Sequence, residues 1–269
     1  NINQISRDSI ISVTLPNLSI NMSRVYPFKR KKAVGAERWY EKISMSYSGE
    51  FRNSITTKED QFLKSNIIKD WTNGMRHSIP ISATFTVFDN IQISPSINYN
   101  ERWYTSRHVE AWDSVQKRNV IVDTVYGFNR VYDYSTSLSF NTKLYGMYTP
   151  WKIFGNKIQA IRHVFTPSIS LSYTPDFSAS RYNFYEKYTY KNEYGDDVEY
   201  IYSPYSRMMF GTAPRGKSGN IGFSFKNNLE MKIRDENDST GFRKMSLIDD
   251  LSIGFSYNMM ADSLKLSTI

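Results

Sequence analysis

The segment SGNIGFSFKNNLEMKI, residues 218–233, alternates between polar and apolar side chains over nearly its whole length. Its apolar residues occupy odd-numbered positions, at Ile221, Phe223, Phe225, Leu229, Met231 and Ile233. A period of two places the two sets on opposite faces of a β-strand. An ordinary strand has about five or six residues, whereas a tilted strand that crosses a membrane needs about ten. This segment is therefore long enough to cross a bilayer.

Four further segments alternate in the same way, at residues 43–51, 79–87, 161–173 and 251–259. A sheet with Ile, Phe, Tyr and Leu on one face and Ser, Thr, Asn and Lys on the other is typical of outer-membrane barrels, in which the apolar face meets lipid and the polar face lines a wet lumen. The sequence therefore predicts an all-β fold, an antiparallel up-and-down transmembrane β-barrel. We expect residues 1–269 to be part of a single outer-membrane barrel domain, a fragment of a larger barrel whose two ends are cut.

Alternation and turn residues predict the strand positions. The expected strands are 9–22, 40–53, 76–88, 91–112, 119–148, 159–174, 218–233, 247–260 and 264 onward. The first strand changes phase at Pro16–Asn17, which predicts a β-bulge, and the fifth is expected to bend near Gly127–Arg130. Proline lacks an N–H, so Pro80, Pro95 and Pro167 should interrupt a ladder and prefer an edge, a bulge or a strand end. A short helix is expected within residues 62–71.

The connections divide between the two ends of the predicted sheet. Segments 54–75, 113–118 and 175–217 should lie at one end, and 24–39, 89–90, 149–158 and 234–246 at the other. In bacterial barrels the long loops face outward and the short turns face the periplasm. The longest segment, 175–217, should form a hairpin around Gly195–Asp197 and fold over the outer mouth. A tight turn is expected at Asp89–Asn90, and another at residues 261–263.

The composition excludes several classes of protein. The chain has no cysteine, which excludes disulfides, cysteine-ligated zinc and thiol catalysis. Its mean hydropathy is −0.52, and it has no apolar run of about 18 residues that could form a transmembrane helix. The 20 Tyr and 5 Trp fit the aromatic girdles of a barrel. The net charge of +8 fits contacts with lipid phosphate and equally fits simple solubility.

Motif matches favour no catalytic, cofactor-binding or metal site. Gly211–Ser218 matches the nucleotide-binding pattern G-x-x-x-x-G-K-[ST], but a strand follows it where a P-loop requires a helix. Residues 235–241 resemble the start of a calcium loop, but the glycine is one place late and Ser246 stands at the twelfth position. The three histidines, His77, His108 and His163, lack metal-like spacing, and His77 and His163 are expected at or near strand ends in the apolar register. The basic cluster Lys29–Lys32 predicts a solvated turn or, alternatively, a contact with lipid phosphate.

Several strand-and-turn phrases together resemble one family. They are LPNLSINMSRVYPFKRK at 15–31, ERWYEKISMSY at 37–47, RHVFTPS at 162–168, GKSG at 216–219, NNLEMK at 227–232 and SLIDDLS at 246–252. These phrases resemble the outer-membrane LPS-assembly proteins (LptD-like) in their Bacteroidota form, and the resemblance covers most of the chain. It implies a very large barrel in the outer membrane of a Gram-negative bacterium that inserts lipopolysaccharide (LPS) into the outer leaflet.

The resemblance also implies the partners and the mechanism. The expected partners are LPS, outer-membrane lipid, a plug lipoprotein and periplasmic LPS-transport components, with no nucleic acid, no cofactor and no covalent chemistry. Within the loop 175–217, we expect Arg207, Arg215 and Lys217 to be available to LPS phosphates, although the loop could equally be an exposed hairpin that touches no ligand. The alternatives are another large barrel (a protein translocon or a nutrient receptor), a secreted glycan-binding β-sandwich, and a barrel hydrolase.

Overall fold

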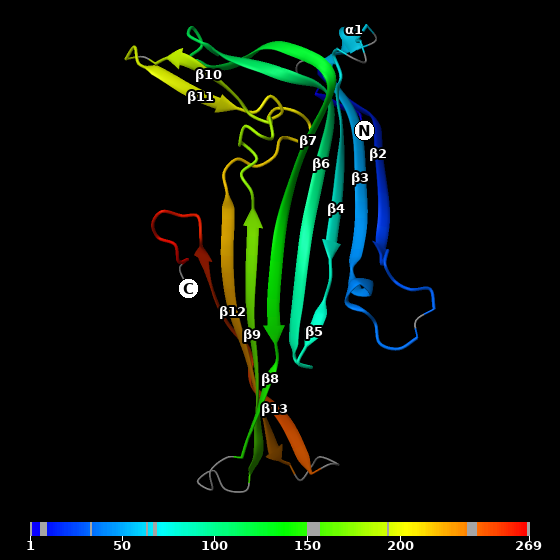
Figure 1. The fold of residues 1–269 in the computed structure, drawn as a ribbon, viewed down its shortest axis with the longest axis vertical. Coiled ribbons are helices and arrows are strands. Elements are labelled where there is room, and N and C mark those ends of the chain that lie inside the picture. The colour runs from blue at the N-terminus through cyan, green and yellow to red at the C-terminus, as the bar shows by residue number, and fades with distance from the viewer. Residues whose placement is uncertain are drawn as a thin grey trace.

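The computed structural model describes residues 2–5, 10–32, 34–62, 64–66, 69–149, 157–192, 194–235 and 241–267. The chain is built almost entirely of strands (Figure 1). They are β1 (Ile2–Ile5), β2 (Ile10–Val25), β3 (Ser44–Lys58), β4 (Thr72–Ser82), β5 (Phe85–Val87), β6 (Ile91–Asp113), β7 (Arg118–Thr142), β8 (Leu144–Tyr148), β9 (Ile158–Thr174), β10 (Glu186–Lys191), β11 (Asp197–Tyr202), β12 (Ser218–Arg234) and β13 (Phe242–Asn258). Two single turns of helix, η1 (Trp39–Lys42) and α1 (Glu59–Phe62), complete the described elements.

The strands form one open antiparallel sheet in the order β1-β2-β3-β4-β6-β7-β9-β12-β13, with β5 beside β6 and β8 beside β9. Each long strand pairs with the next long strand along the chain, so the sheet is an up-and-down meander. Figure 1 shows it as one curved layer, with α1 and the hairpin β10–β11 at one end and the β2–β3 connection at the other. This arrangement confirms the predicted fold class and, for the connections that the structure describes, the predicted division between the two ends.

One face of the sheet is apolar and exposed. Phe223 on β12 lies opposite Ile169 on β9 and Phe255 on β13, and Ile169 lies opposite Phe140 on β7. Directly opposed residues share a face, so these side chains form a continuous apolar surface. Ile169 is 42% exposed and Ile253 is 44% exposed. A soluble monomer rarely exposes so extended an apolar surface, whereas a lipid-facing barrel wall requires one.

The opposite face, which we call the polar face, is lined by small hydroxyl and amide side chains. One row crosses the sheet from strand to strand through Ser44, Ser82, Ser96, Ser137, Ser172, Asn220 and Asn258. Some of these residues bond to one another, as Ser96 Oγ does to Ser137 Oγ at 2.6 Å. Ser224, Lys226, Asn228 and Glu230 alternate with Phe223 and Phe225 and therefore lie on this face, as predicted.

Both predicted irregularities are β-bulges. The pairing of β2 with β3 shifts between Thr14 and Asn17, at the change of phase seen in the sequence. The pairing of β6 with β7 shifts where Tyr104 opposes Asn129 and Ser106 opposes Tyr126, so two residues of β7 oppose one of β6. The predicted bend at Gly127–Arg130 is therefore confirmed.

Pro80 and Pro167 interrupt a ladder, as expected, but they lie inside the sheet and not at an edge, a bulge or a strand end, which corrects that part of the expectation. Pro167 lies within β9, between β7 and β12, and faces Phe225. Because Pro167 has no N–H, the pairing with β9 is interrupted beside it. The predicted strand 119–148 is therefore divided into two strands, and β8 resumes the register of β7 after Lys143. Pro80 lies similarly within β4, where the ladder to β3 is interrupted.

Three other boundaries differ from those predicted. The strand expected at 76–88 divides into β4 and β5 at Ala83–Thr84. The helix expected within 62–71 is not present in the described residues of that range, since the single turn α1 comes before it and ends at Phe62. The strand expected from 264 onward is reduced to one bridge between Tyr257 and Leu266. Leu264 has a φ of 50°, which interrupts the extended conformation before pairing begins. The predicted tight turn at Asp89–Asn90 is confirmed, since it joins β5 to β6.

Candidate lumen-lining site

The segment 175–217 carries the main buried cluster of the described residues. Aromatic and apolar side chains of this segment pack against two side chains of the sheet, and the cluster comprises Phe177, Phe184, Tyr205, Met208 and Ala213 with Tyr104 of β6 and Val131 of β7. The sheet has no second sheet packed on its apolar face in the described part of the chain, so this cluster is where burial stabilises the fold. The architecture therefore excludes the β-sandwich alternative.

Hydrogen bonds anchor the segment over one end of the sheet. The Tyr104 hydroxyl donates to the carbonyl oxygen of Gly211 at 2.6 Å, and the Tyr205 hydroxyl donates to Asn129 Oδ1 at 3.1 Å. The backbone N–H of His108 donates to the carbonyl oxygen of Pro204 at 3.1 Å. The segment therefore folds back over β6 and β7, as predicted for a loop at the mouth.

The predicted hairpin around Gly195–Asp197 is also present, as β10–β11. It lies beside the β6–β7 extension, where the Trp112 and Tyr190 rings stack at 4.3 Å and Arg107 pairs with Glu186. The Asn192 side chain shapes the tip by accepting bonds from the N–H groups of Tyr194 and Asp196, both at 2.9 Å. These contacts order the hairpin against the sheet.

Three arginines of the polar face contact one loop residue, Phe210. Arg52 of β3 and Arg76 of β4 lie over the Phe210 ring, at 5.8 and 5.3 Å from its centroid. Both guanidinium groups pair with the same carboxylate, that of Glu50, and the Arg76 Nη2–Glu50 Oε2 distance is 2.8 Å. A single carboxylate thus serves two cations.

The third arginine, Arg102 of β6, binds the backbone of the same loop residue. Its Nε donates to the carbonyl oxygen of Phe210 at 3.0 Å, and its Nη1 pairs with Asp133 of β7 at 2.5 Å. Because Arg76 opposes Arg102 across the β4–β6 pair, all three guanidinium groups lie on one face. We call Arg52, Arg76 and Arg102 the arginine cluster. Its charges are +3 from the arginines against −2 from Glu50 and Asp133, which leaves a net charge of +1.

The three cations predicted from the sequence lie apart from this cluster. Arg207 bonds to Glu110 Oε1 at 3.3 Å and to the carbonyl oxygen of Asn119 at 3.1 Å, beside the β6–β7 hairpin. Arg215 lies near Asp176, whose pKa is lowered by the Ser178 hydroxyl first and by Arg215 least. Lys217 is exposed at the start of β12. Within the described residues, no hydrogen bond or ion pair brings the three together.

Sequence reasoning missed the arginine cluster, although a signal for it was present. Glu50 and Arg52 continue the polar register of β3, and Arg76 and Arg102 occupy the polar registers of β4 and β6. Charges at polar-register positions of neighbouring strands, all toward the same end, could have marked a charged zone of the lumen. Their contact with Phe210 could not be read from the sequence, because it depends on the path of a loop far along the chain.

The motifs rejected from the sequence remain without a binding geometry. Gly211–Ser218 is an irregular connection that continues directly into β12, so the segment lacks the helix of a P-loop. His77 lies in the middle of β4, not near a strand end, and its Nδ1 bonds to the Tyr47 hydroxyl at 2.8 Å. Within the described residues, no group of His, Asp and Glu is arranged to hold a metal ion. The calcium-like segment 235–241 lies mostly outside the described residues.

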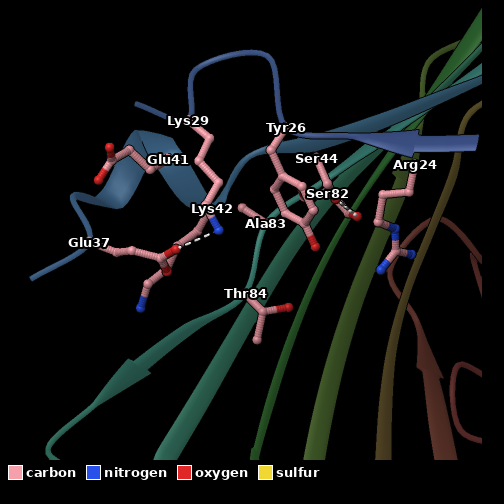
Figure 2. Close-up of a pocket in the computed structure, with 10 residues that line it drawn as sticks. All are labelled: Arg24, Tyr26, Lys29, Glu37, Glu41, Lys42, Ser44, Ser82, Ala83 and Thr84. Atoms are coloured by element: carbon pink, nitrogen blue, oxygen red, sulfur yellow. Dashed lines mark hydrogen bonds and ion pairs between the residues drawn. The ribbon is translucent and has the colours of Figure 1, made fainter. Parts of the chain in front are cut away.

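A second feature lies at the opposite end of the sheet, where the β2–β3 connection borders a cavity of about 370 Å³ (Figure 2). The basic cluster Lys29–Lys32 begins here, and two of its members are held by ion pairs: Lys29 with Glu37 at 3.0 Å and Arg30 with Glu41. Lys31 and Lys32 are exposed. The predicted turn is therefore ordered by its own acidic residues.

The long strands, the exposed apolar face and the polar opposite face together define part of an outer-membrane β-barrel. None of the helices in the described residues is long and apolar enough to span a bilayer. The chain belongs to the LptD protein family, whose model matches residues 1–269. No curated protein and no solved structure matches the chain.

Proposed function

We propose that this chain forms part of the wall of an LPS-transporting barrel in the outer membrane of a Gram-negative bacterium, with all of residues 1–269 in one barrel domain. The sugar headgroup of LPS passes along the polar face, and the acyl chains leave sideways into lipid. The barrel carries out no covalent chemistry. It works with periplasmic LPS-transport components and with a plug lipoprotein inside the lumen.

The observation that carries this proposal is the polar face itself, in a chain of the LptD family. Its central rows are serine and asparagine, which exchange hydrogen bonds with sugar hydroxyls while presenting no charge that would trap an anion. Its charged residues on β3, β4, β6 and β7 gather toward one end, in the arginine cluster. On these four strands the wall outside the cluster is neutral and hydrophilic, which suits the passage of a bulky saccharide, while Lys226 and Glu230 add charges farther across the face, on β12.

The loop end supplies the cations for LPS phosphates. The arginine cluster offers planar guanidinium groups, which bind phosphate oxygens in a bidentate manner. Arg215 and Lys217, exposed beside the start of β12, and Arg207, beside the β6–β7 hairpin, extend the positive surface outward. In this proposal the loop 175–217 faces the cell exterior.

Site-specific photocrosslinking in living cells tests the passage of LPS. Benzoylphenylalanine replaces Ser137, on the polar face, or Leu138, the next residue on the apolar face. We expect LPS adducts at both positions. After LPS synthesis is blocked, the adduct at 137 should disappear because the lumen empties, while the adduct at 138 persists because resident LPS remains in the membrane. An adduct at 137 that never forms, or that persists like the one at 138, refutes the proposal.

The same experiment separates the other barrel functions. A polypeptide captured at position 137 would identify a protein translocon, and a captured small nutrient would identify a receptor. Either result would replace LPS as the cargo while leaving the barrel fold intact.

A further inference from the structure

The cavity at the β2–β3 end opens on the polar face. Ser44 and Ser82 line it, and both belong to the serine row that crosses the sheet. Thr84 also lines it, and its hydroxyl lies 3.4 Å from the hydroxyl of Ser94 on β6. The cavity therefore lies at the lumen end opposite the arginine cluster, and it is a site that the proposed function does not use.

Glu41 holds the wall of the cavity in place. Its carboxylate accepts bonds from the Arg30 guanidinium, from the Arg30 backbone N–H at 3.2 Å and from the Arg38 backbone N–H at 2.7 Å. The residue is only 2% exposed. The Arg30 guanidinium, followed by the Arg38 N–H, lowers the pKa of Glu41 to about 2. Lys29 and Lys42, which flank this bonded segment, are consequently presented from an ordered backbone.

The cavity has more cations than carboxylates available to them. Lys29 pairs with Glu37, and the Glu41 carboxylate is occupied by Arg30. Arg24 and Lys42 line the cavity and have no carboxylate partner in the described part of the chain. Figure 2 shows the Lys29–Glu37 ion pair on one side of the cavity and Arg24 on the other, with Tyr26 and Thr84 between them in this view. Two unpaired cations in a concave site favour an anionic ligand.

The remaining lining groups define the rest of the ligand. The hydroxyls of Tyr26, Ser44, Ser82 and Thr84 can donate and accept hydrogen bonds, as sugar hydroxyls require, and the Tyr26 ring offers an apolar surface. A volume of about 370 Å³ is within the range of small-molecule sites, roughly 300–1,000 Å³. A bare phosphate ion would leave most of this space unused.

The cavity and the arginine cluster lie at opposite ends of the same polar face. Arg52 stands eight residues beyond Ser44 on β3, which corresponds to roughly 26 Å at about 3.3 Å per residue. Between these positions the polar faces of β3, β4, β6 and β7 carry Ser, Asn and Pro up to Glu50 and Arg76. A neutral wall thus separates two positive sites.

We propose that this cavity is a binding site for a phosphorylated saccharide headgroup, in which Arg24 on one side and Lys42 on the other attract its anionic groups and the surrounding hydroxyls hold the sugar. The inference rests on the proposed function for its transport role: the headgroup is held here at one end of the lumen before it reaches the arginine cluster. The ligand chemistry itself rests only on the cavity.

Ligand binding to the full-length protein in detergent tests the site. The probes are glucose 1-phosphate, glucose, inorganic phosphate and phosphatidylglycerol micelles, each measured by ligand-observed NMR. The double variant Arg24→Gln/Lys42→Gln removes the two unpaired cations without breaking an ion pair. Lys31→Gln, an exposed lysine of the same connection outside the cavity lining, is the matched control for general loss of charge.

We expect glucose 1-phosphate to bind at least tenfold more tightly than glucose or inorganic phosphate, and the double variant to lose at least tenfold in affinity while Lys31→Gln retains it. Equal affinity in the wild type and the double variant, or an equal loss in Lys31→Gln, overturns the site. Tighter binding of phosphatidylglycerol than of glucose 1-phosphate overturns the saccharide assignment in favour of a phospholipid headgroup. The outcome is independent of the crosslinking at Ser137, so sugar-phosphate binding without luminal LPS adducts would refute the transport proposal alone.

Discussion

Replacing Phe225 by arginine tests the assignment of the apolar face to lipid. Phe225 lies near the middle of β12, opposite Pro167 and Ile253, and its ring stacks on Phe165 at 6.0 Å. An arginine on the lipid side near mid-bilayer costs about 2–4 kcal/mol. Loss of the aromatic pair costs about 0.5–1.5 kcal/mol more. The sum predicts a decrease of about 2.5–5.5 kcal/mol in the free energy of unfolding.

Ser224→Arg is the matched control, because the neighbouring residue lies on the polar face. Its position opposes Ser168 and Gly254, which leave room for a longer side chain, and water in the lumen can solvate the charge. We expect a change of about 0.5 kcal/mol, as for an exposed substitution. Urea titration of both variants in phospholipid vesicles gives the two free energies. Equal costs for positions 224 and 225 would show that the two faces have been assigned to the wrong environments.

Four other predictions follow from the connections. Phe210→Ala should release the segment 203–213 from the arginine cluster and increase the rate of its proteolysis severalfold. Tyr194→Ala, at the exposed hairpin tip, should leave that rate unchanged, and equal rates in the two variants would contradict the role of the Phe210 ring. Wild type and Lys217→Ala should both show no ATP binding in equilibrium dialysis, and measurable affinity lost in the variant would revive the P-loop. A tag at Asp196 should be cleaved by protease on intact cells, and cleavage only after the outer membrane is opened would invert the topology. In the folded protein the pKa of Glu41 is lowered from its usual value of 4.5 to about 2, so the ionised carboxylate stabilises the 26–43 connection above about pH 4.5 and loses this effect as the pH falls toward 2. Trp39 fluorescence should change over this pH range in the wild type, and this pH-dependent change should be absent in Glu41→Gln.

The strands were predictable because their signal is local. In β12, the polar or apolar character of each residue indicates which face of the strand it occupies, because side chains alternate between faces with a period of two. This pattern does not depend on distant contacts. The bulge at Pro16–Asn17 was visible for the same reason, since a change of phase within one strand requires an extra residue. The strand boundaries near Pro167 were less predictable, because they depend on which neighbour loses a hydrogen bond.

The arginine cluster was not predictable from the sequence, because it depends on the register in which β3, β4 and β6 pair. Arg52, Arg76 and Arg102 become neighbours only when three strands pair as they do here, and Phe210 reaches them only through the fold of the loop. Sequence reasoning selected Arg207, Arg215 and Lys217 instead, since proximity along the chain was the available criterion. Arg207 proved to be engaged with Glu110, and the role of all three as phosphate contacts stays a prediction.

The cavity at the β2–β3 end was likewise not predictable from the sequence. The cluster Lys29–Lys32 was visible as a run of charge, but the chain uses Lys29 and Arg30 to bind Glu37 and Glu41. The cations left without a carboxylate, Arg24 and Lys42, stand outside that run. Arg24 and Lys42 become the unpaired cations of the cavity because Glu37 and Glu41 pair with Lys29 and Arg30, and these ion pairs cannot be predicted from the sequence alone.

In the proposed function, the energetics of the arginine cluster would let the loop rest over the end of the lumen without blocking it permanently. The Phe210 ring holds Arg52 and Arg76 by cation–π contacts, which contribute about 0.5–2 kcal/mol each. A phosphate would replace them with charge-assisted hydrogen bonds, worth about 1.5–3 kcal/mol each, at a site whose net charge is already positive. In the proposed function, an anionic headgroup that arrives at the cluster would compete with the ring for the arginines, against the repulsion of Glu50 and Asp133. In the proposed function, displacing Phe210 would also weaken the hold of Arg102 on the loop backbone, so that occupancy of the site and movement of the loop would be coupled through the same three arginines.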